Sequence, residues 1–318
     1  MNLFKKLRSM NTFGILMAFL VLCILMSILS PSFLNSTNLL NILQQISINF
    51  TIGIGMTFVI LIGGIDLSVG SITALSGMLV AILMKNVGLS VGVSILLTMI
   101  AASLMGLING VFITVFELPP FIATLGMMSI ARGASYSITA GQPIYTLPDD
   151  FLAISSRTAN IPLIAILIML CVFLVAWYVL KYTRFGRHVF AVGGNETCAQ
   201  LSGIDVKKVK ALVYTISGFC CGIGAMLLTS RLDSAVPTNA EGYELNAIAA
   251  VVIGGTSMNG GEGSLIGTLI GSLIIGVIAN GLNLLAIPQG PQRIVNGLVI
   301  VIAVIVDVLR RKTANKAA

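Results

Sequence analysis

Charged residues are scarce in this chain, at 9% of its 318 residues, whereas an ordinary soluble domain carries about 25%. Hydrophobic residues make up 57% of the chain, and no polar segment is long enough to form a second, soluble domain. A soluble domain has no interior large enough to bury this share of apolar side chains. We therefore predict a multi-pass membrane protein with a single transmembrane domain over residues 1–318.

The residue types that carry most enzyme chemistry are scarce as well. The single histidine, His188, lies in a polar loop, which excludes a Ser–His hydrolase within the membrane and a histidine-rich metal site. The five cysteines show no C-x-x-C spacing, so neither a disulfide framework nor a zinc site is indicated. No G-x-x-x-x-G-K-[ST] motif occurs, so the chain has no recognisable ATP site. We expect no enzyme, no bound metal and no cofactor of its own.

Long apolar runs are abundant, and runs of about 20 such residues cross a bilayer as helices. Ten runs can be distinguished, at residues 12–30, 41–62, 67–84, 91–116, 119–140, 161–181, 211–231, 245–258, 264–285 and 293–309. The eighth is short, and the second and third meet at a glycine-rich break, so eight to ten spans fit the sequence. The predicted fold is an all-α membrane protein with about ten transmembrane helices.

The 18 Lys and Arg residues are divided unevenly among the segments between these runs, beginning with Lys5, Lys6 and Arg8. Most fall on one side of the membrane, which the positive-inside rule makes the cytoplasmic side, with both chain termini on it. This asymmetry explains the net charge of +7, so a nucleic-acid partner is not expected. The longest cytoplasmic loop is then 182–210, and the longest external loop is 141–160.

The break between the second and third runs holds a lone carboxylate, Asp66, flanked by Gly63, Gly64 and Gly70. A charge at bilayer depth costs about 2.5–3.5 kcal/mol on insertion scales. Irregular backbone at that depth is tolerated only inside protein or beside a water-filled cavity. Two interpretations follow. Asp66 lines a polar pathway, or it caps the helix after the break by accepting backbone N–H groups.

Uncharged polar side chains recur within the apolar runs. They suit a hydroxyl-rich solute, which needs hydrogen-bond donors and acceptors rather than fixed charge. The alternative is that they only join one helix to another. The candidates for a translocation pathway are Asp66, Ser68, Asn49, Asn109, Thr124, Arg132, Thr256, Asn280 and Asn283.

Several of these residues lie in motifs that run in order along nearly the whole chain. They include Gly63-Gly-Ile-Asp-Leu-Ser-Val-Gly-Ser71, Phe121-Ile-Ala-Thr-Leu125, Leu201-Ser-Gly-Ile204 and Gly254-Gly-Thr-Ser257. With them the chain resembles the membrane permease subunits of bacterial sugar ABC importers. The resemblance implies the ABC importer permease fold, with a monosaccharide as cargo, ribose or a similar pentose or hexose.

The resemblance also implies partners in the bacterial cytoplasmic (inner) membrane. A second permease copy or close relative would pair with this chain within the membrane lipid. ATP-binding ABC subunits would dock on the cytoplasmic side and bind the ATP, and a periplasmic or lipid-anchored binding protein would deliver the sugar.

The basic loop 182–210 would then couple the permease to the ATP-binding subunits, with a short helix expected within residues 191–204. The alternative is a solvated tether. The coupling candidates are Arg187, Gly193, Gly194, Asn195, Glu196, Ser202, Gly203 and Ile204.

Two other transport classes remain on physical grounds alone. Asp66 and Arg132 would suit an ion-coupled secondary transporter, in which they carry a proton or sodium cycle. A passive channel is less well supported, because no ring of like charges is evident.

Overall fold

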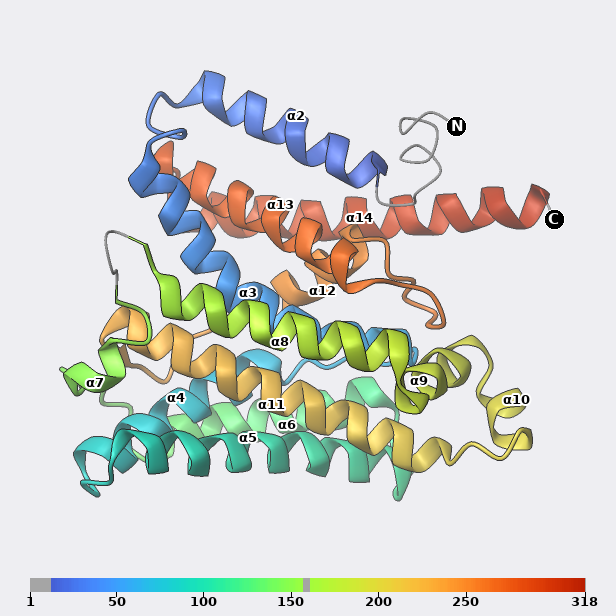
Figure 1. The fold of residues 1–318 in the computed structure, drawn as a ribbon, viewed down its shortest axis with the longest axis horizontal. Coiled ribbons are helices and arrows are strands. Elements are labelled where there is room, and N and C mark those ends of the chain that lie inside the picture. Colours follow the sequence, from blue (N-terminus) through green and yellow to red (C-terminus); the bar gives the residue numbers. More distant parts are fainter. Residues whose placement is uncertain (1–12, 157–160, 318) are drawn as a thin grey trace.

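The computed structural model describes residues 13–156 and 161–317 (Figure 1). Long helices run side by side along the longest axis, with α9 and α10 at one end and α7 at the other. We call these the α9 end and the α7 end. Lys5, Lys6, Arg8 and Arg157, which contribute to the predicted orientation, lie outside the described residues.

A helix occupies each of the ten apolar runs. These are α2 (Phe13–Leu29), α3 (Ser36–Leu61), α4 (Val69–Lys85), α5 (Val91–Thr114), α6 (Pro120–Ser137), α8 (Leu163–Tyr182), α11 (Val206–Leu232), α12 (Tyr243–Ile253), α13 (Leu265–Leu284) and α14 (Gln289–Ala317). Within the described residues, α3, α5, α8, α11 and α13 are long and apolar enough to cross a membrane, judged by length and composition. The number of spans and the side on which the termini lie stay predictions.

The helices differ in how deeply they are buried. The most apolar 18-residue window of α3 is 89% buried, against 17% for the corresponding window of α8. Helix α11 packs against α3, α4 and α5. A Cβ on Gly106 of α5 would overlap the Tyr214 carbonyl oxygen of α11, so glycine allows these two backbones to touch. The core is therefore built around α3 and α11, and α8 turns most of its surface outward.

Two helices end inside the molecule at the same kind of glycine turn. Gly63 after α3 and Gly255 after α12 have φ of 73° and 84°. The Gly64 N–H donates to the Val59 carbonyl over 2.9 Å, and the Thr256 N–H donates to the Val251 carbonyl over 3.2 Å. A hydrogen bond from an N–H to the carbonyl five residues earlier is typical of helices that end at a glycine with left-handed backbone. It explains why α12 ends at Ile253, although the apolar run continues to residue 258.

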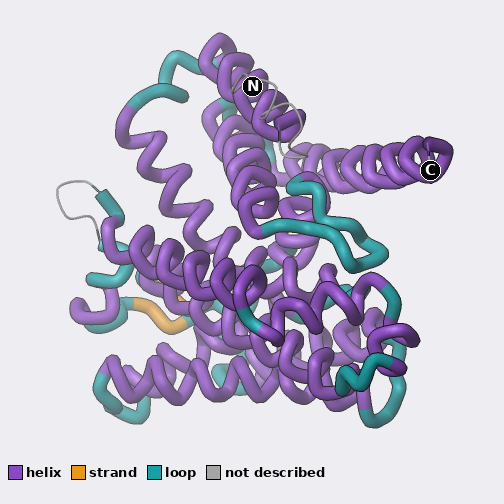
Figure 2. Tube along the Cα trace, turned by 45° about the vertical axis from the view of Figure 1, so that its right-hand side comes forward, coloured by secondary structure: helices purple, strands orange, loops and turns teal. Residues whose placement is uncertain are grey.

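The loops at the α7 end are tied together, which departs from the all-α prediction. Strand β1 (Ile144–Tyr145) pairs antiparallel with β2 (Ser234–Ala235), drawn in orange in Figure 2. The Asp233 carboxylate accepts a 2.8 Å hydrogen bond from the Leu147 N–H, and α7 (Asp149–Leu152) follows. Strands of two residues are too short to show an alternating pattern in the sequence.

The loop 182–210 forms two helices rather than one. Helix α9 (Arg184–Gly194) begins after Thr183, and α10 (Glu196–Leu201) begins after Asn195. The Asn195 side chain accepts the Cys198 N–H over 2.9 Å, so this residue ends one helix and caps the next. Asn195 therefore divides the single helix expected within residues 191–204.

Candidate functional site

The break between α3 and α4 crosses the core with Asp66 at its centre. Asp66 is 0% exposed, and its Oδ1 accepts hydrogen bonds from the Ser68 N–H and the Ser68 hydroxyl. Its Oδ2 accepts from the Ser217 hydroxyl of α11 over 2.8 Å, and the Asn109 amide of α5 donates to Ser68 Oγ over 2.9 Å. Three pathway candidates thus meet in one buried cluster. Asp66 accepts a backbone N–H only from Ser68, which precedes α4, so in this structure it braces the break rather than capping the helix itself. Ser217, 151 positions away in sequence, was not among the candidates.

Neighbouring helices hold the backbone of the break as well. The Thr124 hydroxyl of α6 donates to the Pro120 carbonyl over 2.9 Å and lies 3.3 Å from the Ile65 carbonyl oxygen. A Cβ on Gly64 would lie 2.6 Å from the hydroxyl oxygen of Tyr214, a fully buried residue of α11. In this conformation the break is a tightly packed joint, and Thr124 belongs to it.

The other pathway candidates lie elsewhere. Asn49 and Thr256 are buried, and Asn49 Oδ1 and Thr256 Oγ1 have no hydrogen-bond partner within the described part of the chain. Asn283 Oδ1 accepts from the Gln292 side chain over 2.9 Å. Asn280 of α13 pairs with Asn38 of α3 through two reciprocal amide hydrogen bonds of 2.7 and 3.0 Å. The structure does not bring these residues to a common surface.

The Asn38–Asn280 pair leads to a first prediction. Asn280→Ala should lower thermal stability, because it removes both hydrogen bonds between α3 and α13 and leaves Asn38 only its bond to the Phe33 carbonyl. In a double-mutant cycle with Asn38→Ala, we expect a coupling energy of about 0.6–1.7 kcal/mol, typical of hydrogen bonds between membrane helices. Thermal unfolding in detergent measures it. A coupling energy of zero would show that the pair contributes nothing to stability.

Arg132 borders a cavity of about 470 Å³ between α6, α12 and the segment after β2. Its lining residues are Ser71, Met128, Ser129, Arg132, Gly133, Tyr136, Thr238, Glu241 and Glu244. The Arg132 guanidinium donates through Nη1 to the carbonyls of Pro237 and Asn239, over 2.6 and 3.0 Å. The cavity thus contains a cation anchored to backbone and two carboxylates. Glu244 lies immediately before the apolar run 245–258, and its position beside Arg132 depends on a long-range contact that no local pattern reveals.

At the α9 end, four glycines form a contact that we call the glycine junction: Gly63, Gly193, Gly260 and Gly261. The Gly261 N–H donates to the Leu61 carbonyl at the end of α3 over 2.9 Å. A Cβ on Gly193 of α9 would overlap that same carbonyl oxygen, and a Cβ on Gly260 would lie 2.8 Å from Gly193 O. The glycine junction therefore joins α9 directly to the break after α3 and to the loop after α12.

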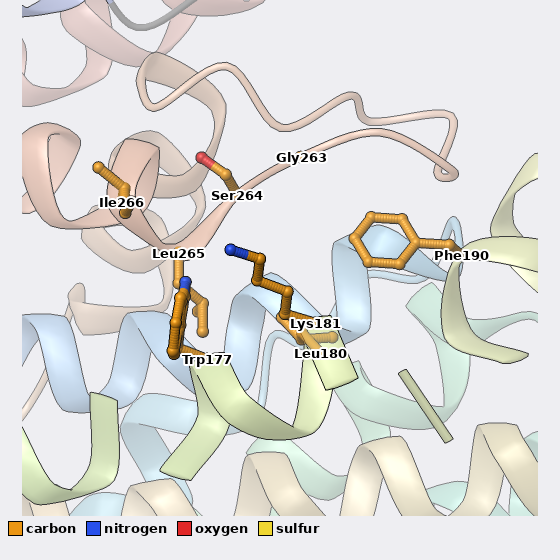
Figure 3. Close-up of a pocket in the computed structure, with 8 residues that line it drawn as sticks. All are labelled: Trp177, Leu180, Lys181, Phe190, Gly263, Ser264, Leu265 and Ile266. Atoms are coloured by element: carbon orange, nitrogen blue, oxygen red, sulfur yellow. The ribbon is translucent and has the colours of Figure 1, made fainter. Parts of the chain in front are cut away.

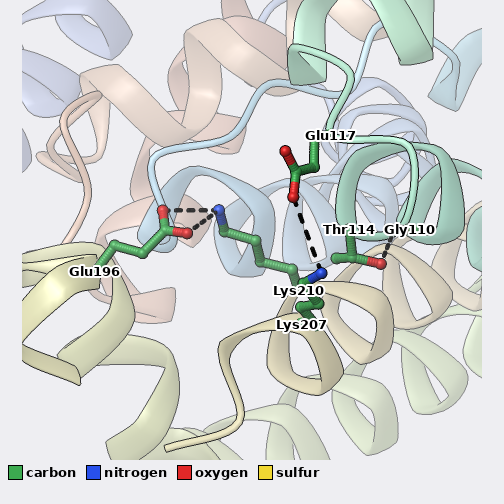
Figure 4. Close-up of polar contacts among 6 residues, drawn as sticks. All are labelled: Gly110, Thr114, Glu117, Glu196, Lys207 and Lys210. Carbon is green, nitrogen blue, oxygen red and sulfur yellow. Dashed lines mark hydrogen bonds and ion pairs between the residues drawn. The ribbon is translucent and has the colours of Figure 1, made fainter. Parts of the chain in front are cut away.

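An ion pair attaches helix α10 to α11 (Figure 4). The Lys210 ammonium donates to both carboxylate oxygens of Glu196, each over 2.7 Å. Lys207 and Glu117 lie 4.0 Å apart and are largely exposed, so their ion pair contributes little. The remaining coupling candidates are mainly exposed, Arg187, Gly194, Ser202 and Gly203 among them.

An apolar cavity of about 210 Å³ lies between α8, α9 and the start of α13 (Figure 3). Trp177, Phe190 and Leu265 line it, and the Lys181 ammonium lies 4.8 Å from the centroid of the Trp177 ring. A cation above an aromatic ring at a helix end is typical of the boundary between membrane and water. This geometry supports placing the α9 end at a membrane surface.

Comparison with known proteins identifies the family. Residues 38–304 match the family described as branched-chain amino acid transport system / permease component. The ribose import permease protein RbsC of Bacillus subtilis is 47% identical over 308 residues, which cover 96% of this chain and 94% of the relative. RbsC of Escherichia coli is 45% identical over 299 residues, covering 92% of each chain.

The D-allose transport system permease protein AlsC of Escherichia coli is 41% identical over 304 residues, 92% of this chain and 91% of the relative. No solved structure matches the chain. The family match covers most of the chain, and the relatives align along nearly all of it. The chain is therefore an integral membrane protein that belongs to this family of transport permease components.

Proposed function

We propose that this chain is the membrane-spanning permease subunit of an ATP-driven, binding-protein-dependent importer of a monosaccharide, ribose or a similar pentose or hexose. The observation that carries this proposal is the identity of 47% with a ribose import permease over 96% of the chain. The family description names amino acids, but the relatives compared here are named for ribose and D-allose. A cavity with three hydroxyl side chains, from Ser71, Ser129 and Thr238, also suits a sugar.

In this proposal residues 1–318 form one transmembrane domain in the cytoplasmic membrane, paired with a second copy or a close relative. The α9 end faces the cytoplasm, because Arg184 and Arg187 in α9 and Lys208 at the start of α11 place an excess of basic residues at this end. The loops joined by β1 and β2 then lie outside the cell and face the sugar-binding protein.

The α9 end is also where the ATP-binding subunits would dock. Arg187 on α9, Asn195 between the two helices and Leu201 on α10 are exposed there, and a surface that mixes charged, polar and apolar side chains suits a protein contact. Closure of the ATP-binding subunits would move α9 and α10, and the glycine junction would pass this movement to the breaks after α3 and α12. The permease pair would then alternate between outward and inward access, and the sugar would cross chemically unchanged.

Purification of the tagged chain from its native membrane tests the proposal. We expect an ATP-hydrolysing subunit to accompany it, and binding protein loaded with D-ribose to stimulate hydrolysis in proteoliposomes. Binding protein without sugar, and L-leucine in place of D-ribose, are the controls. A chain that purifies alone and moves solute only under a proton or sodium gradient would contradict the importer and favour the secondary transporter.

A further inference from the structure

The cavity beside Arg132 has the features of a ligand site. We propose that Arg132, Glu244 and the surrounding hydroxyls bind the monosaccharide inside the permease during its passage. This inference rests on the proposed function and deepens it, because it names the place where the sugar is held. Among these residues Arg132 is one of the pathway candidates from the sequence, whereas Glu244, a polar residue at the edge of an apolar run, is not.

The first argument is the unused hydrogen-bonding capacity of Glu244. Its Oε2 is shielded from solvent and has no hydrogen-bond partner among the residues that the structure describes. A Cβ on Gly70 would overlap that oxygen, so the side chain lies against the start of α4 only because residue 70 is glycine. A buried acceptor left unpaired is destabilising. A rotation of the Glu244 side chain toward the cavity, which it lines, would bring this oxygen to a hydroxyl donor there.

The second argument is the preorganisation of Arg132. Its Nη1 is fixed by two backbone carbonyls, while a guanidinium carries five N–H donors in all. No ion pair within 4.0 Å joins Arg132 to Glu244 in the described structure. A donor and an acceptor that do not satisfy each other therefore border the same cavity.

The third argument concerns the size and chemistry of the space. A volume of about 470 Å³ lies within the range of about 300–1,000 Å³ that small-molecule pockets occupy. Ser71, Ser129 and Thr238 add hydroxyls that both donate and accept, and Tyr136 adds an aromatic ring. Each hydroxyl of a sugar also donates and accepts, so a monosaccharide can satisfy all of these groups.

Protection from thiol labelling tests the site directly in the complete transporter. Ser129→Cys introduces a thiol at the cavity, and Cys171, exposed on α8 and not among the lining residues, serves as an internal control for a membrane-permeant maleimide. We expect D-ribose to slow labelling of the introduced thiol at least fivefold and to leave Cys171 unaffected. Adding Glu244→Gln should remove this protection. Thr238→Cys replaces Ser129→Cys if that variant does not assemble.

Transport measurements separate this site from the proposed function. Glu244→Gln should reduce D-ribose uptake at least tenfold while hydrolysis stimulated by the binding protein continues. Glu117→Gln, which removes an exposed carboxylate at the α9 end, should leave the D-ribose protection of the introduced thiol unchanged. Normal uptake and full protection in Glu244→Gln would overturn the site and leave the importer intact. Protection by L-leucine but not by D-ribose would overturn the sugar assignment, and a wild-type chain that imports no sugar would overturn the function itself.

Discussion

Gly193→Ala is expected to uncouple ATP hydrolysis from transport, whereas Gly194→Ala should transport normally. A methyl group at residue 193 would overlap the Leu61 carbonyl oxygen and the Gly261 nitrogen, and neither backbone atom can rotate away. At residue 194 a Cβ meets nothing within 4 Å. Two adjacent glycines of one helix thus differ completely in the space around them.

The expected loss of stability in Gly193→Ala follows from overpacking. Forcing a methyl group into a filled site costs about 1–3 kcal/mol, and here relief requires α9 to move away from the end of α3. Gly194→Ala, by contrast, gains up to about 1 kcal/mol of helix propensity. We expect uptake per ATP hydrolysed to fall at least tenfold in Gly193→Ala alone. The assay is D-ribose uptake and hydrolysis in the same proteoliposomes.

Thermal unfolding of both variants completes this test. A modest loss of stability in Gly193→Ala with intact assembly would show that the glycine junction transmits movement rather than merely permitting folding. Equal coupling in the two variants would remove the glycine junction from the mechanism. The coupling role of α9 and α10 would then have to rest on the Lys210–Glu196 contact.

Much of the fold could be predicted because the hydrophobic length of a membrane helix is a local property. Each of the ten apolar runs contains a helix. Boundaries were less accurate, since polar caps extend helices beyond the apolar run. Helix α3 begins after Asn35, which accepts the Thr37 N–H, and α11 begins after Asp205, which accepts the Lys208 N–H.

The candidate site was harder to predict, because its contacts join distant segments. Asp66 was identified as an isolated charge, but its partner Ser217 lies on another helix. Glu244 is recognised as a site residue only by its packing against Gly70 and its place in one cavity with Arg132, and neither neighbour is close to it in sequence. Likewise, Gly193 and Gly194 look alike in the sequence, and only the backbone of α3 distinguishes them. Composition shows that polar groups exist in the membrane, whereas tertiary packing determines which of them meet.

Asp66 provides the second prediction with a large effect, because two substitutions separate its possible roles. Asp66→Ala removes the acceptor for the Ser68 N–H, the Ser68 hydroxyl and the Ser217 hydroxyl. Buried donors left unpaired cost about 1–3 kcal/mol each. We expect Asp66→Ala to lose at least about 2 kcal/mol of stability and most of its transport.

Asp66→Asn keeps the shape and one acceptor oxygen but removes the charge. Its Oδ1 can still accept the Ser68 N–H, and its amide can donate to Ser217 Oγ, because a hydroxyl both donates and accepts. If Asp66 serves to hold the break to α11, Asp66→Asn retains most of the stability and the transport that Asp66→Ala loses. If its charge carries a coupling ion, Asp66→Asn is stable and does not transport. Because the carboxylate is wholly enclosed by hydroxyl and backbone donors, we expect the first result, measured as uptake and thermal unfolding of the two variants side by side.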